Sequence, residues 1–332
     1  GILIEYPTVR ALDKLGTGLA QGDNEGRQGV PRQARDDKTD VMVSPSMNSG
    51  QALSNHDDTS DEINERSANS APRQDQGDNK VGRGDRIGVG VIGAGNYARS
   101  TLLPALARTK ARLAAVADIN GVAAGHAARK FGAGKAITDY HEILEDSAVQ
   151  AVFVLVGHHL HARFVCEALE AGKHVFVEKP LAIDEGQLAE VVNAYERVTL
   201  RPLDTLGTGS VEPSPFLMVG FNRRFSPHTV KIRELLAGRT EPLTMTMTVN
   251  AGFIPPENWV QDPERGGGRI IGEGCHFIDL LSYLAGSPVK TVTAAMVGGN
   301  EPVREDKMSI LLGFADGSVG TVHYFANGSK SY

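Results

Sequence analysis

Residues 89–98 read Val-Gly-Val-Ile-Gly93-Ala-Gly95-Asn-Tyr-Ala98, an apolar run that ends in a glycine-rich turn. The pattern predicts a buried strand, the turn and then a helix. In such a turn the first glycine permits the tight bend, the second lets a phosphate approach the backbone, and a small third residue lets the helix pack closely. Free N–H groups at the start of the helix favour an anion. We therefore expect a dinucleotide to bind at Gly93, Gly95, Asn96, Tyr97 and Ala98.

Asp118 supplies a second cofactor signal. It closes the next predicted strand, 25 residues after Gly93, close to the spacing at which a carboxylate hydrogen-bonds the adenosine ribose. Its charge would repel a 2′-phosphate, and the Ile-Asn-Gly that follows it contains no arginine or lysine. We therefore expect NAD rather than NADP. A second interpretation is that Asp118 caps the following helix, and the two roles are compatible.

Strands and helices alternate around this motif from Arg86 onward. The apolar runs of the strands are nearly continuous, which is typical of a parallel sheet covered on both faces. The predicted strands lie at 87–92, 113–118, 151–156 and 174–177, and the predicted helices at 96–109, 122–131, 161–171 and 185–197. The pattern predicts an α/β fold with a doubly wound, Rossmann-type sheet.

The regular alternation of predicted strands and helices ends at a turn-rich linker, which extends to about Pro215. Strands are predicted at 216–221, 243–249, 290–297, 309–314 and 319–325, and helices at 227–236 and up to Ala285. Turn sequences at Asp316-Gly317 and Asn327-Gly328 imply a largely antiparallel sheet. We therefore predict a first domain at 86–205 and a second, α+β domain at 206–332 for substrate binding and oligomerisation.

Residues 1–85 are predicted to be a disordered acidic tail. Of the 19 aromatic residues in the chain, only Tyr6 lies in this segment, which has 10 basic and 15 acidic residues. Without large apolar side chains, a segment cannot offset the loss of backbone entropy on folding, roughly 1–2 kcal/mol per residue.

Composition excludes several classes of function. The formal net charge of −6 excludes a basic field that would attract nucleic acid or anionic lipid. No apolar run approaches the roughly 20 residues needed to cross a membrane. The two cysteines, Cys166 and Cys275, are far apart and have no zinc-ligand spacing, so we expect a reducing, cytoplasmic location.

Several segments carry a family resemblance, in a fixed order. They are Gly93-Ala-Gly95-Asn, the stretch from His161 to Leu181 that contains Glu178-Lys179-Pro180, Gly220-Phe-Asn-Arg-Arg-Phe, and Asp262-Pro-Glu-Arg-Gly-Gly-Gly-Arg followed by His276-Phe-Ile-Asp. From about Ile87 to Tyr332 the chain resembles the glucose-fructose oxidoreductase, inositol dehydrogenase and rhizopine-catabolism (Gfo/Idh/MocA) family. It is most similar to members that follow a zinc-type alcohol dehydrogenase-like part in two-part oxidoreductases. Family chains continue past the position of Tyr332, so the resemblance implies a second domain that is either truncated or unusual here.

Lys179 is the first candidate catalytic residue. Because it precedes a proline and ends a predicted parallel strand, we expect it in an extended conformation where ligands bind such sheets. Its ammonium could hydrogen-bond a substrate hydroxyl and stabilise an alkoxide as a hydride leaves for the nicotinamide. The resemblance implies the same role. The alternative is an exposed lysine after a strand.

His276 is the candidate general base, because an imidazole can accept a hydroxyl proton at neutral pH. The family pattern GGG-x-L-x-D-x-G-x-H supports this role, although a core histidine is the alternative. The aspartate of that pattern is Gly272 in this chain, and Glu273 follows it. Since residues three apart on a helix stay close, we expect Glu273 to replace the aspartate in part and to contact substrate.

The remaining candidates rest on shorter signals. The resemblance implies that Gly157 and His158 line the nicotinamide side of the cofactor, and we assign Glu178 to the cofactor as well. Arg223 and Arg224 could bind substrate hydroxyls through their planar donors, or be solvated. Trp259 could stack on a sugar ring or belong to the core. We expect no metal, because the cluster of His158, His159 and His161 lies in an extended turn with no accompanying cysteine.

These features predict an NAD-dependent dehydrogenase for a hydroxyl of a sugar, polyol or nucleotide sugar. The alternative is an inactive regulatory protein that binds NAD or a sugar, as the galactose-regulon repressor relatives of the family do, and the missing aspartate at Gly272 favours it. The resemblance also implies a homo-oligomer formed through the second sheet. We expect no nucleic-acid or membrane partner.

Overall fold

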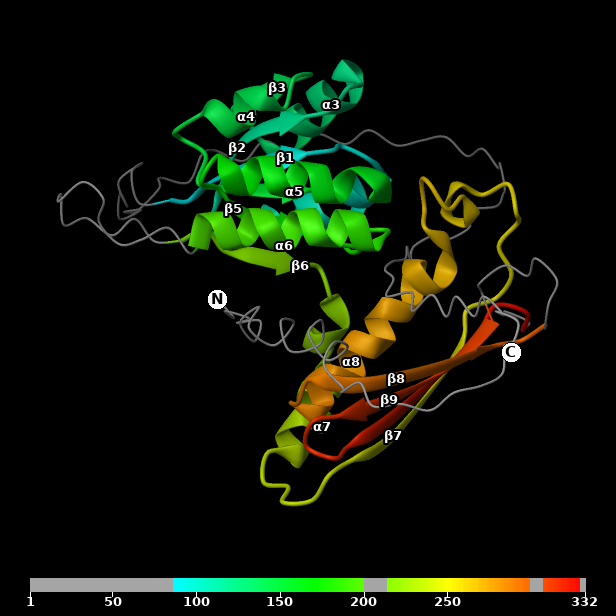
Figure 1. The fold of residues 1–332 in the computed structure, drawn as a ribbon. Helices are drawn as coiled ribbons and strands as arrows, with labels where there is room; N and C mark the ends of the chain where they lie inside the picture. The colour runs from blue at the N-terminus through cyan, green and yellow to red at the C-terminus, as the bar shows by residue number, and fades with distance from the viewer. Residues whose placement is uncertain (1–85, 200–213, 299–306, 329–332) are drawn as a thin grey trace, which may run out of the picture.

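The computed structural model describes residues 86–199, 214–298 and 307–328, which form two regions of regular structure (Figure 1). The predicted tail at 1–85 and the predicted boundary between residues 205 and 206 lie outside the described residues. Within the described part, no helix is long and apolar enough to span a lipid bilayer.

Six parallel strands form the first sheet, in the order β3-β2-β1-β4-β5-β6. They are β1 (Gly88–Ile92), β2 (Arg112–Ala117), β3 (Lys135–Ile137), β4 (Ala151–Val154), β5 (His174–Val177) and β6 (Leu217–Val219). The strand order reverses between β1 and β4, and ligands of such sheets bind beyond the carboxyl ends at this point. The predicted doubly wound sheet is confirmed.

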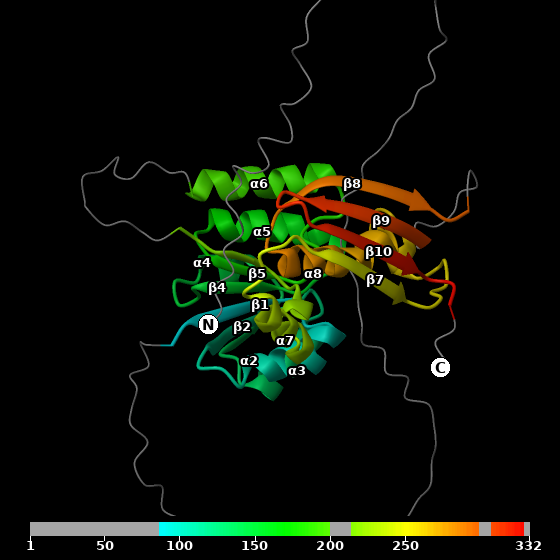
Figure 2. The ribbon, with the colours of Figure 1, turned by 90° about the horizontal axis from the view of Figure 1, so that it is seen from below.

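Helices cover both faces of this sheet (Figure 2). On one face, α2 (Leu103–Leu106) and α3 (Gly121–Phe131) pack in a cluster with Val91 and Val116. On the other face, a second cluster surrounds Val152 and Val177. It includes residues of α4 (His141–Glu145), α5 (His161–Glu170) and α6 (Glu185–Thr199). Burial of both faces explains the continuous apolar runs of the strands.

Several local features differ from the sequence-based prediction, which contains neither β3 nor α4. The predicted helix at 96–109 contains a π-helical turn, Ala98–Leu102, before α2. The strand predicted at 216–221, in the second domain, corresponds to β6. It is instead the sixth strand of the first sheet, where Val219 pairs with Val177 of β5. A short apolar run carries no signal for the sheet that it joins, so the sequence pattern could not place β6.

The second sheet has the strand order β7-β10-β9-β8. Its strands are β7 (Thr244–Asn250), β8 (Val289–Met296), β9 (Lys307–Phe314) and β10 (Val319–Phe325). The pairs of β9 with β8 and with β10 are antiparallel, whereas β7 and β10 are parallel. The predicted, largely antiparallel sheet is therefore confirmed. Strands β7 and β10 are distant in the sequence, so no turn sequence could predict that they pair.

Helices α7 (Pro227–Leu236) and α8 (Cys275–Ala285) accompany this sheet. Phe277 and Leu281 of α8 lie in one buried cluster with Val322 and Tyr324 of β10. In Figure 1, α8 lies between the two sheets. The amino end of α8 follows a second π-helical turn, Ile270–Gly274.

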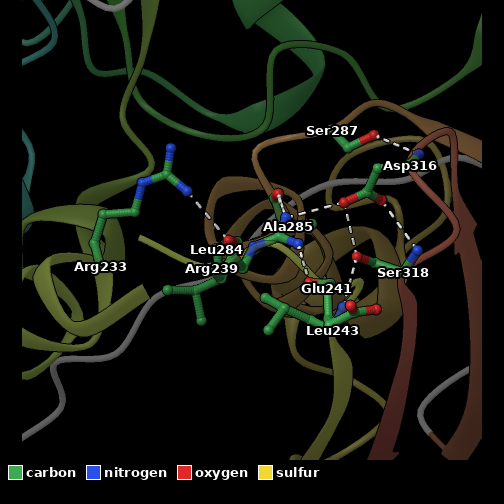
Figure 3. A network of polar contacts seen from close by, with 9 residues as sticks. All are labelled: Arg233, Arg239, Glu241, Leu243, Leu284, Ala285, Ser287, Asp316 and Ser318. Carbon is green, nitrogen blue, oxygen red and sulfur yellow. Dashed lines mark hydrogen bonds and ion pairs between the residues drawn. The ribbon is translucent and has the colours of Figure 1, made fainter. Parts of the chain in front are cut away.

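Two arginines hold the carboxyl end of α8 (Figure 3). Arg233 donates to the carbonyl of Leu284 at 3.2 Å, and Arg239 donates to the carbonyl of Ala285. Arg239 also donates to the carboxylate of Asp316 at 2.9 Å, in the turn between β9 and β10. Cations at this end complement the helix dipole. The network therefore fixes α8 to the second sheet.

Arg239→Ala removes the hydrogen bond to α8 and the ion pair with the turn. We expect the free energy of unfolding to fall by about 1–2 kcal/mol, measured by urea denaturation at pH 7. Lys231→Ala is the control, because the ion pair of Lys231 with Glu234 is exposed and should contribute less than about 0.5 kcal/mol. Equal effects of the two substitutions would contradict this view of the network.

Candidate functional site

The glycine-rich turn between β1 and the next helix has two glycines with different roles. Gly93 has a φ of +100°, and a Cβ there would lie 2.3 Å from the carbonyl oxygen of Leu155. Gly93 therefore meets a requirement of the fold itself. A Cβ at Gly95 would meet nothing within 4 Å. The free space at Gly95 fits a cofactor phosphate, because the fold alone does not require a glycine at this position.

Asp118 follows β2 and bonds to the same turn. Its Oδ2 accepts a hydrogen bond from the backbone N–H of Ala94 at 2.7 Å, and its Oδ1 accepts one from Asn120 at 2.8 Å. The side chain of Asn120, not that of Asp118, caps α3. The alternative role of Asp118 as the helix cap is therefore wrong. Each carboxylate oxygen can accept further bonds, so the position is compatible with a ribose diol.

Tyr97 and Glu178 connect the glycine-rich turn to the end of β5. Burial of the Tyr97 hydroxyl, together with the negative charge of Glu178, raises the pKa of Tyr97. Burial also raises the pKa of Glu178, against the opposing effect of the neighbouring Lys179 ammonium. A Cβ at Gly220 would lie 2.8 Å from Glu178 Oε1. The close approach explains a glycine after β6.

Lys179 lies directly after β5, at the carboxyl end of the first sheet, and is buried. Desolvation lowers the pKa of its ammonium, and the positive charge of Arg223 lowers it further. The negative charges of Glu178 and Glu273 act in the opposite direction. Because water does not compete for this buried group, Lys179 can bind a polar group of a ligand strongly.

His276 is buried in the first turn of α8. Burial lowers the pKa of its imidazole to about 3, and the charges of Lys179 and Arg223 contribute to that shift. Its Nδ1 atom is buried and has no hydrogen-bond partner among the described residues. The ring is therefore neutral at pH 7 and can accept a proton from a ligand.

Glu273 and Arg223 lie beside these two groups. Arg223 Nη2 is 3.7 Å from Glu273 Oε1, and its guanidinium stacks over the ring of Phe277 with 4.5 Å between Cζ and the ring centroid. Arg223 Nε is buried and has no partner within the described part of the chain. Glu273 and Arg223 therefore lie near Lys179, and Arg223 also lies near His276.

Arg224 is oriented differently from its neighbour Arg223. It donates from Nε to Asp279 Oδ2 at 2.7 Å and from Nη2 to Asp279 Oδ1. A bidentate pair of this kind fixes the guanidinium. Arg224 therefore joins the segment after β6 to α8, which differs from the predicted substrate contact. Sequence could not distinguish the adjacent arginines, because both follow the same strand.

His158 joins the loops of the two domains. Its Nδ1 donates to the carbonyl of Gly266 at 2.9 Å, and the edge of the Trp259 ring lies against it, 4.6 Å between centroids. Burial lowers the pKa of His158 to about 3, so its ring is neutral. Trp259 is 39% exposed, which contradicts the alternative that it belongs to the core. Gly157, next to His158, precedes a short 3-10 helix, His158–Leu160.

In the predicted histidine cluster, the ring of His161 lies between two backbone carbonyl oxygens. His161 Nδ1 lies 2.5 Å from the carbonyl oxygen of Pro180, and its Nε2 lies 3.0 Å from that of Val156. In the part of the chain that the structure describes, no group of three His, Cys, Asp or Glu side chains could hold a metal ion. The cluster of His158, His159 and His161 therefore shows no geometry for a metal.

Two residues near the site were missed by the sequence analysis. The Tyr324 hydroxyl donates to Glu273 Oε2 at 2.7 Å, and Arg269 Nη2 lies 3.5 Å from the same oxygen. The four-residue spacing of Arg269 and Glu273 is a signal for an ion pair and could have been noticed. Nothing near Tyr324 in the sequence indicates its partner.

Comparisons with known proteins match two parts of this chain to one family. A family model described as an oxidoreductase family with an NAD-binding Rossmann fold (GFO_IDH_MocA) matches residues 87–201, and a GFO/IDH/MocA C-terminal domain model matches 230–332. Inositol 2-dehydrogenase 2 of Saccharopolyspora erythraea is 32% identical over 255 residues, covering 74% of this chain and 67% of that protein.

Solved structures show the same fold. An NAD binding oxidoreductase from Klebsiella pneumoniae is 25% identical, with a TM-score of 0.59 over 74% of this chain and 68% of that one. A levoglucosan dehydrogenase in complex with NADH and L-sorbose is 24% identical, with a TM-score of 0.61 over 74% and 68%; this likeness shows the fold alone. The chain thus spans about two thirds of the length of these relatives.

Gly95→Ala tests the cofactor turn. Its new methyl group would occupy open space, so we expect the melting temperature to be unchanged. Because the methyl group would stand where a phosphate approaches, the Kd for NADH should rise at least about tenfold, measured by fluorescence titration. Gly125→Ala, in α3, is the control and should leave NADH binding unchanged. Equal affinities of the Gly95 variant and the unmodified protein would refute the assignment.

Proposed function

We propose a function from one premise: the chain belongs to the Gfo/Idh/MocA family of oxidoreductases, whose first domain is an NAD(P)-binding Rossmann domain. The protein oxidises a hydroxyl of a sugar, polyol or nucleotide sugar with NAD, or catalyses the reverse reduction. The observation that carries the proposal is the burial of Lys179 and His276 close to one another, next to the cofactor turn. His276 is neutral, as a general base must be.

The cofactor is held by the first domain. Gly95 leaves space for the pyrophosphate, and Asp118 lies where a carboxylate would bind the adenosine ribose. Bound NAD supplies the acceptor for the hydride. The charge of Glu178, which directly precedes Lys179, acts on Tyr97 of this turn, so the residues proposed to bind the cofactor lie close to the catalytic ones. The negative charge of Asp118 favours NAD over NADP.

The substrate hydroxyl is bound by Lys179 and deprotonated by His276. The Lys179 ammonium donates to the hydroxyl oxygen and stabilises negative charge on it as the C–H bond breaks. The neutral imidazole of His276 has a free ring nitrogen that can take the proton. Arg223 and Glu273 bind neighbouring hydroxyls. Trp259 lies exposed at the edge of His158, where it can contact a sugar ring.

Other features of the family resemblance remain proposals. The outer face of the second sheet, which α8 does not cover, exposes Leu311 and Val319, and a homo-oligomer formed through this face would bury them. The similarity to two-part oxidoreductases remains a prediction, since both matched models belong to one family. A cytoplasmic location also remains a prediction.

A regulatory protein without catalysis is the second candidate function. It is favoured by the glycine at position 272, where the family pattern has an aspartate. The presence of Lys179 and His276 in the expected places supports the enzyme instead.

Lys179→Ala and His276→Ala test the enzyme directly. With NAD and a panel of myo-inositol, D-xylose, levoglucosan and UDP-glucose, we expect the unmodified protein to form NADH, measured at 340 nm. Loss of the group that stabilises the alkoxide, or of the base, should lower kcat by about 10²–10⁴-fold. Lys135→Ala is the matched control, because Lys135 is exposed and paired with Asp146.

The alternative function gives a different result in the same assay. Tight NADH binding with no turnover of any panel compound would favour the regulatory protein. Full activity of both alanine variants would refute the assigned roles.

The pH profile tests the state of His276. Because burial and two nearby cations hold its pKa at about 3, the imidazole should remain a base well below the usual value of about 6.5. We therefore expect kcat/KM to change by less than about twofold between pH 7.5 and 6. An inflection near pH 6.5 that disappears in His276→Gln would contradict the buried, neutral imidazole.

A further inference from the structure

The two oxygens of the Glu273 carboxylate have different surroundings. Oε2 accepts a hydrogen bond from the Tyr324 hydroxyl at 2.7 Å and lies 3.5 Å from Arg269 Nη2. Within the described residues, no hydrogen bond reaches Oε1, and Arg223 Nη2 approaches it at 3.7 Å. One oxygen is therefore anchored, while the other is directed toward the site and can still accept a hydrogen bond.

The anchor belongs to the second sheet. Tyr324 is 0% exposed and lies in β10, where its ring packs in the buried cluster beneath α8. Arg269 is 1% exposed and donates to the carbonyls of Gly252 at 2.5 Å and Ala251 at 3.2 Å, just after β7. Burial raises the pKa of Tyr324, and the negative charge of Glu273 raises it further, so the phenol stays protonated as a donor.

Arg223 supplies the opposite kind of group. Its guanidinium is fixed over Phe277, and its buried Nε has no partner among the described residues. A buried donor without a partner costs free energy unless a ligand satisfies it. A second donor of the same guanidinium, Nη2, lies 3.7 Å from the acceptor oxygen of Glu273. Two neighbouring hydroxyls of a sugar or cyclitol match this arrangement, because a hydroxyl both donates and accepts.

We propose that Tyr324 and Arg269 are positioning residues that hold Glu273, so that its Oε1 and the guanidinium of Arg223 together bind two adjacent hydroxyls of the substrate. The proposal rests on the proposed function and names the part of the substrate that the second domain recognises. Tyr324 itself does not touch the substrate. Its effect passes through Glu273, which makes the two residues energetically coupled.

The test compares substrates with and without the recognised hydroxyls. The parent compound is whichever of myo-inositol, D-xylose and levoglucosan has the highest kcat/KM, and its monodeoxy analogues each lack one hydroxyl. We expect Tyr324→Phe and Glu273→Gln to lower kcat/KM for the parent by about tenfold. For the analogue that lacks the hydroxyl bound by Glu273, both variants should have nearly unchanged kcat/KM.

A double-substitution cycle separates positioning from general loss of structure. Combining Tyr324→Phe with Glu273→Gln should lower kcat/KM no further than Glu273→Gln alone. Tyr283→Phe, in α8, is the matched control and should leave kcat/KM unchanged. Thermal melts followed by circular dichroism check that each variant folds.

Three results would overturn the proposal. Tyr324→Phe could lower kcat/KM equally for the parent and every analogue, which would mean a structural role. The two substitutions could have additive effects, or Tyr324→Phe could have none. If the unmodified protein turns over no compound, the proposed function fails. In that case the binding of myo-inositol to the NADH complex is measured by saturation-transfer NMR. Loss of binding in Glu273→Gln and in Tyr324→Phe would support the proposed roles of both residues. No binding to the unmodified protein, or unchanged binding in the variants, would overturn the proposal.

Discussion

Burial of the Lys179 ammonium between the two domains is the constraint on which the rest of the site depends. A buried cation costs free energy unless nearby groups compensate it. Here Glu178 and Glu273 offer negative charge, one from the end of the first sheet and one from the second domain. The same cation helps to keep His276 neutral. The positive charge of Lys179 therefore acts on two groups of the second domain: it attracts Glu273, and it lowers the pKa of His276.

Specific polar contacts join the first sheet, and the segment that follows it, to the second domain. His158 donates to the carbonyl of Gly266, and Arg224 forms a bidentate pair with Asp279 of α8. Two π-helical turns, Ala98–Leu102 and Ile270–Gly274, lie next to the cofactor turn and to His276. Such turns are frequent at functional sites because they redirect side chains locally. The site is thus assembled by loops and turns that two rigid sheets support.

Sequence predicted the parts of this arrangement that depend on local pattern. The glycine-rich turn, strands β1, β2, β4 and β5 and the position of Lys179 all follow from periodicity and from glycine and proline placement. The sheet that β6 joins, the pairing of Arg224 with Asp279 and the bond from Tyr324 to Glu273 did not follow. The two side-chain contacts join residues that are more than 40 positions apart in the sequence. Strand β6 belongs to an apolar run that is too short to carry a periodic signal.

The central claim is that this chain transfers a hydride from a hydroxyl-bearing carbon of a sugar or polyol to NAD. The most direct measurement uses the best panel substrate with deuterium at its reacting carbon and follows the reduced cofactor by NMR. We expect one deuterium at the nicotinamide C4 for each oxidised product, and far less reduced cofactor with Lys179→Ala under the same conditions. Reduced cofactor without deuterium, or no reduction although NAD and the sugar both bind, would contradict it.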